Sequence, residues 1–226
     1  MTVTLITGGN KGLGFETARQ LISAGHQVWI GARDPDRGQQ AAGQLGARFV
    51  PLDVTDDASA AAAADRVGEL DVLVNNAGIA GERTDAADTT AGHMRRVYET
   101  NVFGPVRVLH AFLPLLQNSG QPVVVNVSSG LGSIAAAAAP GSPVAAFAMV
   151  YSSSKAALDM LTVKYAAAFP AMRINAVDPG FTATDLNQHR GTQTVAEGAR
   201  VIVQYAMIGA DGPSGGFFSS SGPVVW

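Results

Sequence analysis

The chain alternates between short, nearly continuous apolar runs and longer alanine-rich segments of helical character. The apolar runs, rich in Val and Ile, predict strands at 3–7, 27–32, 47–53, 71–76, 122–129 and 172–177. The longer segments predict helices at 12–24, 35–45, 56–68, 90–117, 151–169 and 192–207. Apolar strands that are each followed by a helix are typical of a parallel sheet covered on both faces. We therefore predict an α/β fold, a doubly wound sheet of about seven strands in the order 3-2-1-4-5-6-7.

Local features support this arrangement. Asp34-Pro35 predicts a helix start, because aspartate caps helices and proline is favoured at their first position. Pro51 lies inside the third strand, which suits an edge strand because proline cannot donate a ladder hydrogen bond. The alanine run that ends in Pro-Gly, residues 135–141, is expected to be a loop near the carboxyl edge of the sheet. No linker or internal repeat divides the sequence, so we expect one domain over residues 1–226.

Composition then narrows the class of protein. Of the 226 residues, 47% are hydrophobic and 15% are charged, and the net charge is −3. This balance argues against disorder, and against a dedicated nucleic-acid binder, which would usually be basic. The chain has no cysteine, and its four histidines are scattered without helical spacing. We therefore expect neither a disulfide nor a metal site.

The same sequence predicts no association with a membrane. The first residues, MTVTLITGG, enter a strand-like run at once and lack the regions of a signal peptide. The longest apolar candidate for a membrane span, 134–150, is interrupted by Pro140, Gly141 and Pro143. We therefore expect a cytoplasmic protein.

The octapeptide TGGNKGLG, residues 7–14, follows the first strand and leads into the first helix. Its glycines fit neither a P-loop, in which lysine follows the last glycine, nor the G-x-G-x-x-G fingerprint. Its position flanks the switch point where doubly wound sheets bind ligands. Glycines there let the backbone approach a diphosphate, and the helix N-terminus supplies partial positive charge. A plain strand-to-helix turn is the weaker interpretation.

Further motifs follow in order along almost the whole chain. They are Asp53-Val54, Asn75-Asn76-Ala77-Gly78, Asn101, Asn126-Val127-Ser128-Ser129, Tyr151-x-x-x-Lys155 and Asp178-Pro179-Gly180. Together with T-G-x-x-x-G-x-G, this set resembles the short-chain dehydrogenase/reductase family. The segment GARD, residues 31–34, is similar to the carbonyl-reductase-like branch. The resemblance implies a Rossmann sheet with helices on both faces and a nicotinamide cofactor.

The end of the second strand predicts which cofactor is used. Enzymes that prefer NAD carry an acid there, which hydrogen-bonds the adenosine ribose and would repel the 2′-phosphate of NADP. That position is Ala32 here, and Arg33 follows it. A guanidinium offers a bidentate fork to phosphate, and Lys11 would lie near the same group. Asp34 is the counter-argument, but as an N-cap its carboxylate should face backbone amides. We predict NADP(H), although Arg33 taken alone is equally compatible with a solvated surface charge.

The resemblance also implies the residues that bind this cofactor. Asp53 would contact the adenine amino group, Val54 would offer its backbone to the ring, and Asn75 would flank the ribose, although Asn75-Asn76 could instead only brace the sheet. The full implied set is Gly8, Asn10, Lys11, Gly12, Leu13, Gly14, Arg33, Asp53, Val54, Asn75, Ala77, Gly78, Tyr151, Lys155, Pro179, Gly180, Thr182 and Thr184.

The candidate catalytic pair is Tyr151 and Lys155, which share one face of a helix because they are four residues apart. A tyrosine titrates near ~10 in water, so work as a general acid-base near neutrality requires a lowered pKa. A nearby ammonium stabilises the phenolate. We therefore expect Lys155 and the oxidised nicotinamide to lower the pKa of Tyr151. The resemblance gives Lys155 a second role, binding the hydroxyls of the nicotinamide ribose.

Two further polar residues complete the candidate site. By the family pattern, Ser129 would hydrogen-bond the substrate carbonyl oxygen, and Ser128 would be a strand-end residue bonded to backbone. A buried asparagine inside a helix is disfavoured unless it has a role. By resemblance, Asn101 holds a water that links Lys155 to solvent.

The chain departs from the family pattern between Ser129 and Tyr151, which are 22 positions apart where many members have about a dozen. The extra residues resemble a shortened form of the insertion in monomeric carbonyl reductases, so we expect a monomer or homodimer and disfavour a tetramer. The following loop carries Phe181 and Leu186 and no run of charge, which suggests a small neutral or apolar carbonyl or alcohol as substrate. His189 and Arg190 are better explained as exposed loop residues than as ligands of an anionic substrate.

We therefore predict an oxidoreductase that transfers hydride reversibly between NADPH and a carbonyl carbon. One alternative is a catalytically silent redox sensor that binds NADP(H), but such proteins typically lose the Tyr or the Lys. A second is a nucleotide-sugar epimerase or dehydratase, whose glycine spacing and larger C-terminal domain are not present here.

Overall fold

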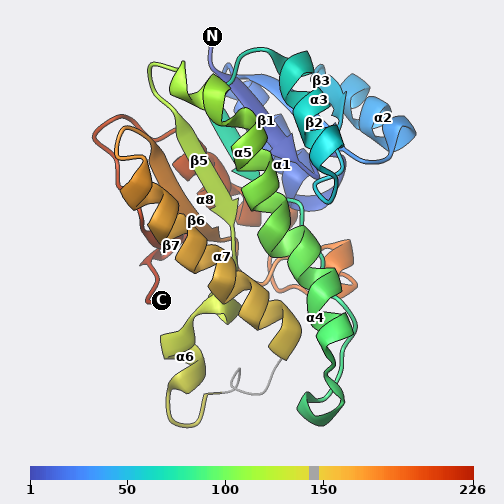
Figure 1. The fold of residues 1–226 in the computed structure, drawn as a ribbon, viewed down its shortest axis with the longest axis vertical. Coiled ribbons are helices and arrows are strands. Elements are labelled where there is room, and N and C mark those ends of the chain that lie inside the picture. Colours follow the sequence, from blue (N-terminus) through green and yellow to red (C-terminus); the bar gives the residue numbers. More distant parts are fainter. Residues whose placement is uncertain (143–147) are drawn as a thin grey trace.

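The computed structural model describes residues 1–142 and 148–226, which form an eight-stranded sheet flanked by helices (Figure 1). The strands are β1 Val3–Thr7, β2 Gln27–Ala32, β3 Arg48–Pro51, β4 Val72–Asn75, β5 Val123–Val127, β6 Arg173–Asp178, β7 Phe217–Ser219 and β8 Gly222–Pro223. Their order is β3-β2-β1-β4-β5-β6-β7-β8, and all neighbours run parallel except the hairpin pair β7 and β8. The predicted α/β fold and strand order are confirmed. The short strand β8 was not expected from the glycine- and serine-rich tail.

Helices cover both faces of this sheet, as predicted. They are α1 Gly12–Ser23, α2 Pro35–Leu45, α3 Asp57–Val67, α4 Ala91–Tyr98, α5 Gly104–Gln117, α6 Ile134–Ala138, α7 Met149–Ala168 and α8 Val195–Ala206. One buried cluster joins the sheet to α3, α5 and α7, and the other joins it to α1, α2 and α8. Successive strand residues feed alternate clusters: Leu5 packs with the first and Ile6 with the second. Each strand is therefore buried on both faces, which explains its continuous apolar sequence.

The predicted start of α2 and the predicted edge position of β3 are both confirmed. The carboxylate of Asp34 accepts a hydrogen bond from the amide of Arg37, with Pro35 at the first position of α2. Gly46 ends that helix in the left-handed region, at φ 68°. Pro51 ends β3, the edge strand of the sheet, where its missing N–H breaks no inner ladder.

Two predicted segments differ from the structure. The helix expected over 90–117 is divided into α4 and α5 by a π-helical turn, Glu99–Phe103. The loop expected over 135–141 contains the short helix α6, because alanine favours helix and Ser133 caps it by accepting from the amide of Ala136. Residues 143–147 of the insertion that we expected before Tyr151 lie outside the described residues.

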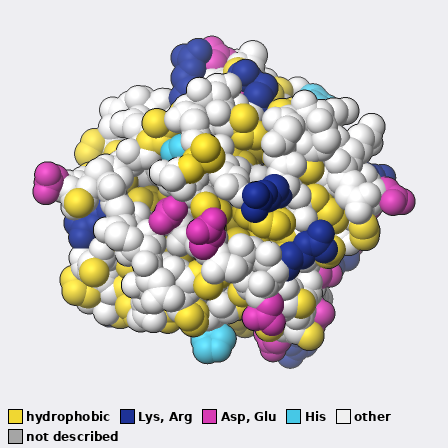
Figure 2. Space-filling model, turned by 90° about the horizontal axis from the view of Figure 1, so that it is seen from above, with side chains coloured by type: hydrophobic (Ala, Val, Ile, Leu, Met, Phe, Trp, Pro, Cys, Tyr) yellow, Lys and Arg dark blue, Asp and Glu magenta, His cyan; other side chains and the backbone are white. Residues whose placement is uncertain are grey.

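The surface at the end where the chain begins carries charges of both signs, interspersed with apolar atoms (Figure 2). That face therefore presents no continuous field of one sign to a partner. Within 1–142 and 148–226, none of the helices is long and apolar enough to cross a membrane.

Candidate active site

The predicted motifs meet at the carboxyl edge of the sheet, where β1, β4, β5 and β6 end. The loop after β1 reaches α1 through Gly8 and Gly12, whose φ values of 64° and 54° are readily adopted by glycine. Gly14 lies in the first turn of α1, where a Cβ would sit 2.6 Å from the carbonyl oxygen of Gly8. The loop therefore folds back tightly on itself, and Leu13 packs beneath it in the core cluster of α1 and α8.

Thr7 and Asn76 hold this glycine loop against the end of β4. The hydroxyl of Thr7 accepts from the amides of Asn76 and Ala77, both at 3.0 Å. The side-chain amide of Asn76 donates to the carbonyls of Thr7 at 2.9 Å and Gly8 at 3.2 Å. A bracing role was one alternative for the pair Asn75-Asn76, and the Asn76 side chain has that role.

A cavity of about 290 Å³ opens between the glycine loop and α2. Asn10 and Lys11 line it from the loop, and Arg37 lines it from the first turn of the helix. The Lys11 ammonium also forms an ion pair with Asp185 at 2.7 Å. Cations beside glycine backbone and a helix N-terminus suit a phosphate group, so this donor set fits a phosphorylated cofactor.

Arg37 was not among the predicted cofactor-binding residues. Its place in the first turn of a capped helix, four positions after Arg33, is the signal that could have found it. Arg33 itself is exposed, and its charge helps to lower the pKa of Asp53. The stronger cause of that lowered pKa is hydrogen bonding from Thr55, whose amide and hydroxyl donate to Asp53 at 2.9 and 2.7 Å. Val54 beside it is buried against Gly104. Asp53 is thus ionised and oriented at the end of β3.

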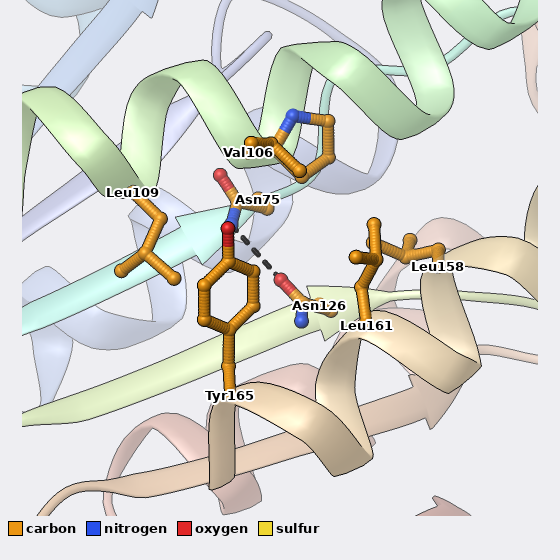
Figure 3. Close-up of a pocket in the computed structure, with 8 residues that line it drawn as sticks. Asn75, Val106, Leu109, Asn126, Leu158, Leu161 and Tyr165 are labelled. Carbon is orange, nitrogen blue, oxygen red and sulfur yellow. Dashed lines mark hydrogen bonds between the residues drawn. The ribbon is translucent and has the colours of Figure 1, made fainter. Parts of the chain in front are cut away.

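The side chain of Asn75 lies between the sheet and the α5–α7 layer (Figure 3). Its amide donates to Asn126 at 2.9 Å, and the Asn126 amide donates to Thr162 at 2.8 Å. The hydroxyl of Tyr165 points toward this pair (Figure 3). The geometry therefore favours the sheet-bracing alternative for the Asn75 side chain over contact with a ribose.

The catalytic candidates come together beside the end of β5. Lys155 is buried, its ammonium donates to the carbonyl of Val127 at 2.8 Å, and it lies 5.5 Å from the centre of the Tyr151 ring. Ser129 caps the short turn Gly130–Gly132 and hydrogen-bonds Tyr151. A phenol, a hydroxyl and an ammonium are thus placed within one small volume.

Asn101 lies in the π-helical turn and is buried, as predicted. Its carboxamide pairs with the backbone of Ile79, accepting from the amide and donating to the carbonyl, both at 2.9 Å. It also donates to Ser154 at 3.0 Å. A Cβ on Gly78 would lie 3.5 Å from the Asn101 oxygen and 3.7 Å from the Lys155 nitrogen. Asn101 therefore joins the segment after β4 to the helix that carries Lys155, and π-helical turns are frequent at functional sites.

The pKa values of Tyr151 and Lys155 bear on the expectation that the pKa of Tyr151 is lowered. Burial raises the pKa of Tyr151 above its ordinary value, a hydrogen bond with Ser129 lowers it, and two carboxylates, Asp178 and Asp159, raise it. Burial also lowers the pKa of Lys155 to about 8. In the protein without cofactor, burial therefore dominates the pKa of Tyr151, and its lowering by Lys155 and the oxidised nicotinamide together stays a prediction.

The segment after β6 contacts the glycine loop. Gly180 adopts a φ of 74°, and the buried hydroxyl of Thr182 donates to the Pro179 carbonyl at 3.1 Å. A Cβ on Gly12 would lie 3.7 Å from the methyl group of Thr184. The structure thus places the predicted residues of this segment beside the loop after β1. Among the described residues, the hydroxyl of Ser128, expected to bond backbone, has no hydrogen-bond partner.

Comparisons with known proteins agree with this geometry. A family model described as short chain dehydrogenase matches residues 2–195. The (+)-neomenthol dehydrogenase of Arabidopsis thaliana is 34% identical, over 95% of this chain and 95% of the relative. Salutaridine reductase from Papaver somniferum matches with a TM-score of 0.86 at 30% identity, over 97% of this chain and 100% of that chain.

The carbonyl reductase Sniffer of D. melanogaster, at 23% identity, matches with a TM-score of 0.87 over 100% of each chain and shares the fold. The resemblance found in the sequence motifs is confirmed by the family model and the closely covered relatives. The chain belongs to the short-chain dehydrogenase/reductase family of nicotinamide-dependent oxidoreductases.

Proposed function

We propose that the protein is an NADPH-dependent carbonyl reductase that interconverts a ketone or aldehyde and its alcohol. The observation that carries this proposal is the cluster of Tyr151, Lys155 and Ser129 beside the end of β5, at the same edge of the sheet as the glycine loop. When bound, the reduced nicotinamide would supply the hydride for carbonyl reduction, and the oxidised nicotinamide would accept it in the reverse reaction. The remaining tasks, holding the carbonyl oxygen and moving a proton, fall to this chain's residues.

The carbonyl oxygen gains negative charge as its carbon is reduced, so donors aimed at that oxygen stabilise the transition state. The hydroxyls of Ser129 and Tyr151 are the donors, and Tyr151 gives its proton to the oxygen. The ammonium of Lys155 compensates the phenolate that remains, because opposite charges in a buried site attract strongly. Asn101 keeps α7 and the segment after β4 in register while this happens.

The preference for NADPH over NADH is supported by the cavity beside α2. Lys11 and Arg37 line that cavity, and Ala32 replaces the acid that would repel a 2′-phosphate. Asp34, two positions after Ala32, has its carboxylate engaged by the amide of Arg37, as expected of an N-cap.

A neutral or apolar substrate is supported by the side chains around the insertion and the segment after β6. Ile134, Met149, Phe181 and Leu186 are large apolar residues that are exposed to solvent. Exposed apolar side chains beside a binding site favour an apolar ligand. Two relatives are named salutaridine reductase and (−)-isopiperitenone reductase, so we include both of these compounds in a first panel of substrates.

The test is NADPH oxidation with a panel of ketones and aldehydes, followed by absorbance. We expect turnover by the wild-type protein and a loss of at least about a hundredfold for Tyr151→Phe, because general acid catalysis contributes roughly that much. NADPH affinity, measured by fluorescence, should change little. Tyr205→Phe, which removes a hydroxyl from the core on the α8 side, is the matched control and should keep full activity.

Tight NADPH binding without turnover across the panel would contradict the reductase and favour the redox sensor. Equal loss of activity in Tyr205→Phe would show that any tyrosine hydroxyl matters for folding and would remove the support for Tyr151.

A further inference from the structure

A third ionisable residue continues the row of Tyr151 and Lys155 along α7. Asp159 lies one helical turn beyond Lys155, on the same face, and only 4% of it is exposed. Neither carboxyl oxygen has a hydrogen-bond partner within the part of the chain that the structure describes. An unpartnered buried carboxyl is costly, so its retention requires a reason.

Among the residues that the structure describes, those around Asp159 shield it from solvent and include one cation. Gly132 approaches so closely that a Cβ there would lie 2.7 Å from a carboxyl oxygen of Asp159 and 3.0 Å from the Cβ of Lys155. From the end of β5, the hydroxyl of Ser128 lies close enough to lower the pKa of the carboxyl without meeting the geometry of a hydrogen bond, and from β6 the carboxylate of Asp178 raises that pKa. Tyr151 and Lys155 face it from α7, and Lys155 is the cation.

Lys155 in turn has little to compensate its charge. Its ammonium donates to the carbonyl of Val127, which is neutral. Burial lowers its pKa to about 8, and the carboxylate of Asp159 raises it. Burial likewise raises the pKa of Asp159 to about 7, and Lys155 lowers it. Each group thus favours the charged form of the other.

We propose that Asp159 is a positioning residue for the reductase reaction, whose carboxylate keeps Lys155 protonated at neutral pH. Lys155 can then compensate the phenolate of Tyr151 during proton transfer. Asp159 touches neither substrate nor cofactor in this scheme and acts through Lys155. Its kinetic consequences rest on the proposed function, whereas the charge coupling between the two side chains does not.

The charge of Lys155 can be followed directly, because the chain has three lysines, Lys11, Lys155 and Lys164. Protein carrying lysine labelled with ¹³C at Cε gives three titrating NMR signals, assigned through Lys11→Arg and Lys164→Arg. We expect the Lys155 midpoint near pH 8 in the wild type. In Asp159→Asn it should fall by at least about one pH unit, since an opposite charge at this range shifts a pKa by roughly that much.

The other two signals serve as internal controls because Lys11 and Lys164 are exposed. Asp65→Asn, which removes an exposed carboxylate on α3, should leave the Lys155 midpoint unchanged. Ser128→Ala keeps the carboxyl but removes the hydroxyl that favours its ionised form. It should shift the Lys155 midpoint in the same direction as Asp159→Asn, by less, and it covers the case in which the Asn variant does not fold.

The kinetic arm measures kcat/KM for carbonyl reduction against pH. Because only the ammonium form of Lys155 assists, activity should decline above the Lys155 midpoint, and this alkaline limb should move down in Asp159→Asn. A merely structural role would lower activity equally at all pH values and leave the limb in place. An unchanged Lys155 midpoint in folded Asp159→Asn overturns the proposal. A shifted midpoint in a protein without any turnover would instead overturn the proposed function and leave the charge coupling standing.

Discussion

Two cations, Lys11 and Arg37, line the cavity beside α2, and each already has an acidic neighbour, as has Arg33 at the end of β2. Lys11 pairs with Asp185 at 2.7 Å, and Arg37 pairs with Asp34 at 3.3 Å. The charge of Arg33 acts on Asp53. Such exposed pairs contribute roughly 0–1 kcal/mol, so a phosphate dianion can replace the carboxylates at little cost. In the NADPH complex that we propose, the 2′-phosphate would take the place of these weak partners.

Among these cations, Arg37 offers the sharpest test of the cofactor proposal. Replacing it with alanine should weaken NADPH binding about tenfold or more while leaving NADH binding nearly unchanged, because a hydrogen bond to a charged group contributes roughly 1.5–3 kcal/mol. Dissociation constants for both cofactors, measured by fluorescence, check this. Arg66→Ala, on the exposed surface of α3, is the control. Equal weakening for NADH and NADPH would place the 2′-phosphate elsewhere.

At the scale of elements, the loop after β1 and the first turn of α1 form one rigid unit with the end of β4. Gly14 is the tightest point, because a Cβ there would lie 2.5 Å from the side-chain amide of Asn76 and 2.6 Å from the carbonyl of Gly8. Neither neighbour can move without breaking a hydrogen bond of the loop. Glycine at this position is therefore required by packing, independently of any ligand.

A pair of glycine substitutions in two helices tests this account. Gly14→Ala should destabilise the protein by roughly 1–3 kcal/mol, the usual cost of overpacking, and should weaken NADPH binding. Gly43→Ala in α2 meets no atom within 4 Å. It should stabilise the protein by about 0.4–1 kcal/mol by reducing the entropy of the unfolded chain. Urea unfolding curves measure both, and a Gly14→Ala protein as stable as the wild type would contradict the packing argument.

Across the whole molecule, distant segments meet around α6, beside the place that we propose for the substrate. The ring of Trp226 stacks on Phe217 of β7, with ring centres 5.4 Å apart. Its carbonyl accepts from the amide of Ala135 in α6 at 2.9 Å, and the Val225 carbonyl accepts from the hydroxyl of Ser133 at 2.7 Å. The last residues of the chain thus tie α6, which follows Ser129, to the edge of the sheet, while the cofactor elements lie nearer the other edge.

We therefore predict that a substitution at the end of the chain changes the affinity for substrate and leaves the affinity for cofactor unchanged. Trp226→Ala should raise the KM for the carbonyl compound about threefold to tenfold, because an aromatic pair contributes roughly 0.5–1.5 kcal/mol. The dissociation constant for NADPH should stay unchanged. Val225→Ala, whose side chain is exposed and whose backbone contact remains, is the control. A parallel loss of NADPH affinity in Trp226→Ala would show that the two halves of the sheet are not independent.

Much of the fold and of the site was predictable from the sequence because the signals are local. Apolar runs placed six of the strands within a few residues of their observed bounds, and Pro51 identified the edge strand. The spacing of Tyr151 and Lys155 placed them on one face of α7. The π-helical turn and α6 were missed, since a continuous helical pattern conceals an inserted residue and an alanine run before Pro-Gly resembles a loop.

The sequence by itself determined the order of the strands, the glycine loop and the identity of the catalytic candidates, because periodicity, turn residues and short motifs act over a few neighbouring positions. Only the tertiary structure decided that Arg37 lines the cavity, that Asn75 braces the sheet, and that Asp159 is buried with no hydrogen-bond partner in residues 1–142 and 148–226. It also decided that Lys155 loses its proton more readily than a free lysine. The burial and the direction of these side chains depend on residues that are far away in the chain. Desolvation shifts the pKa values of Asp159 and Lys155 only once those residues are packed around them.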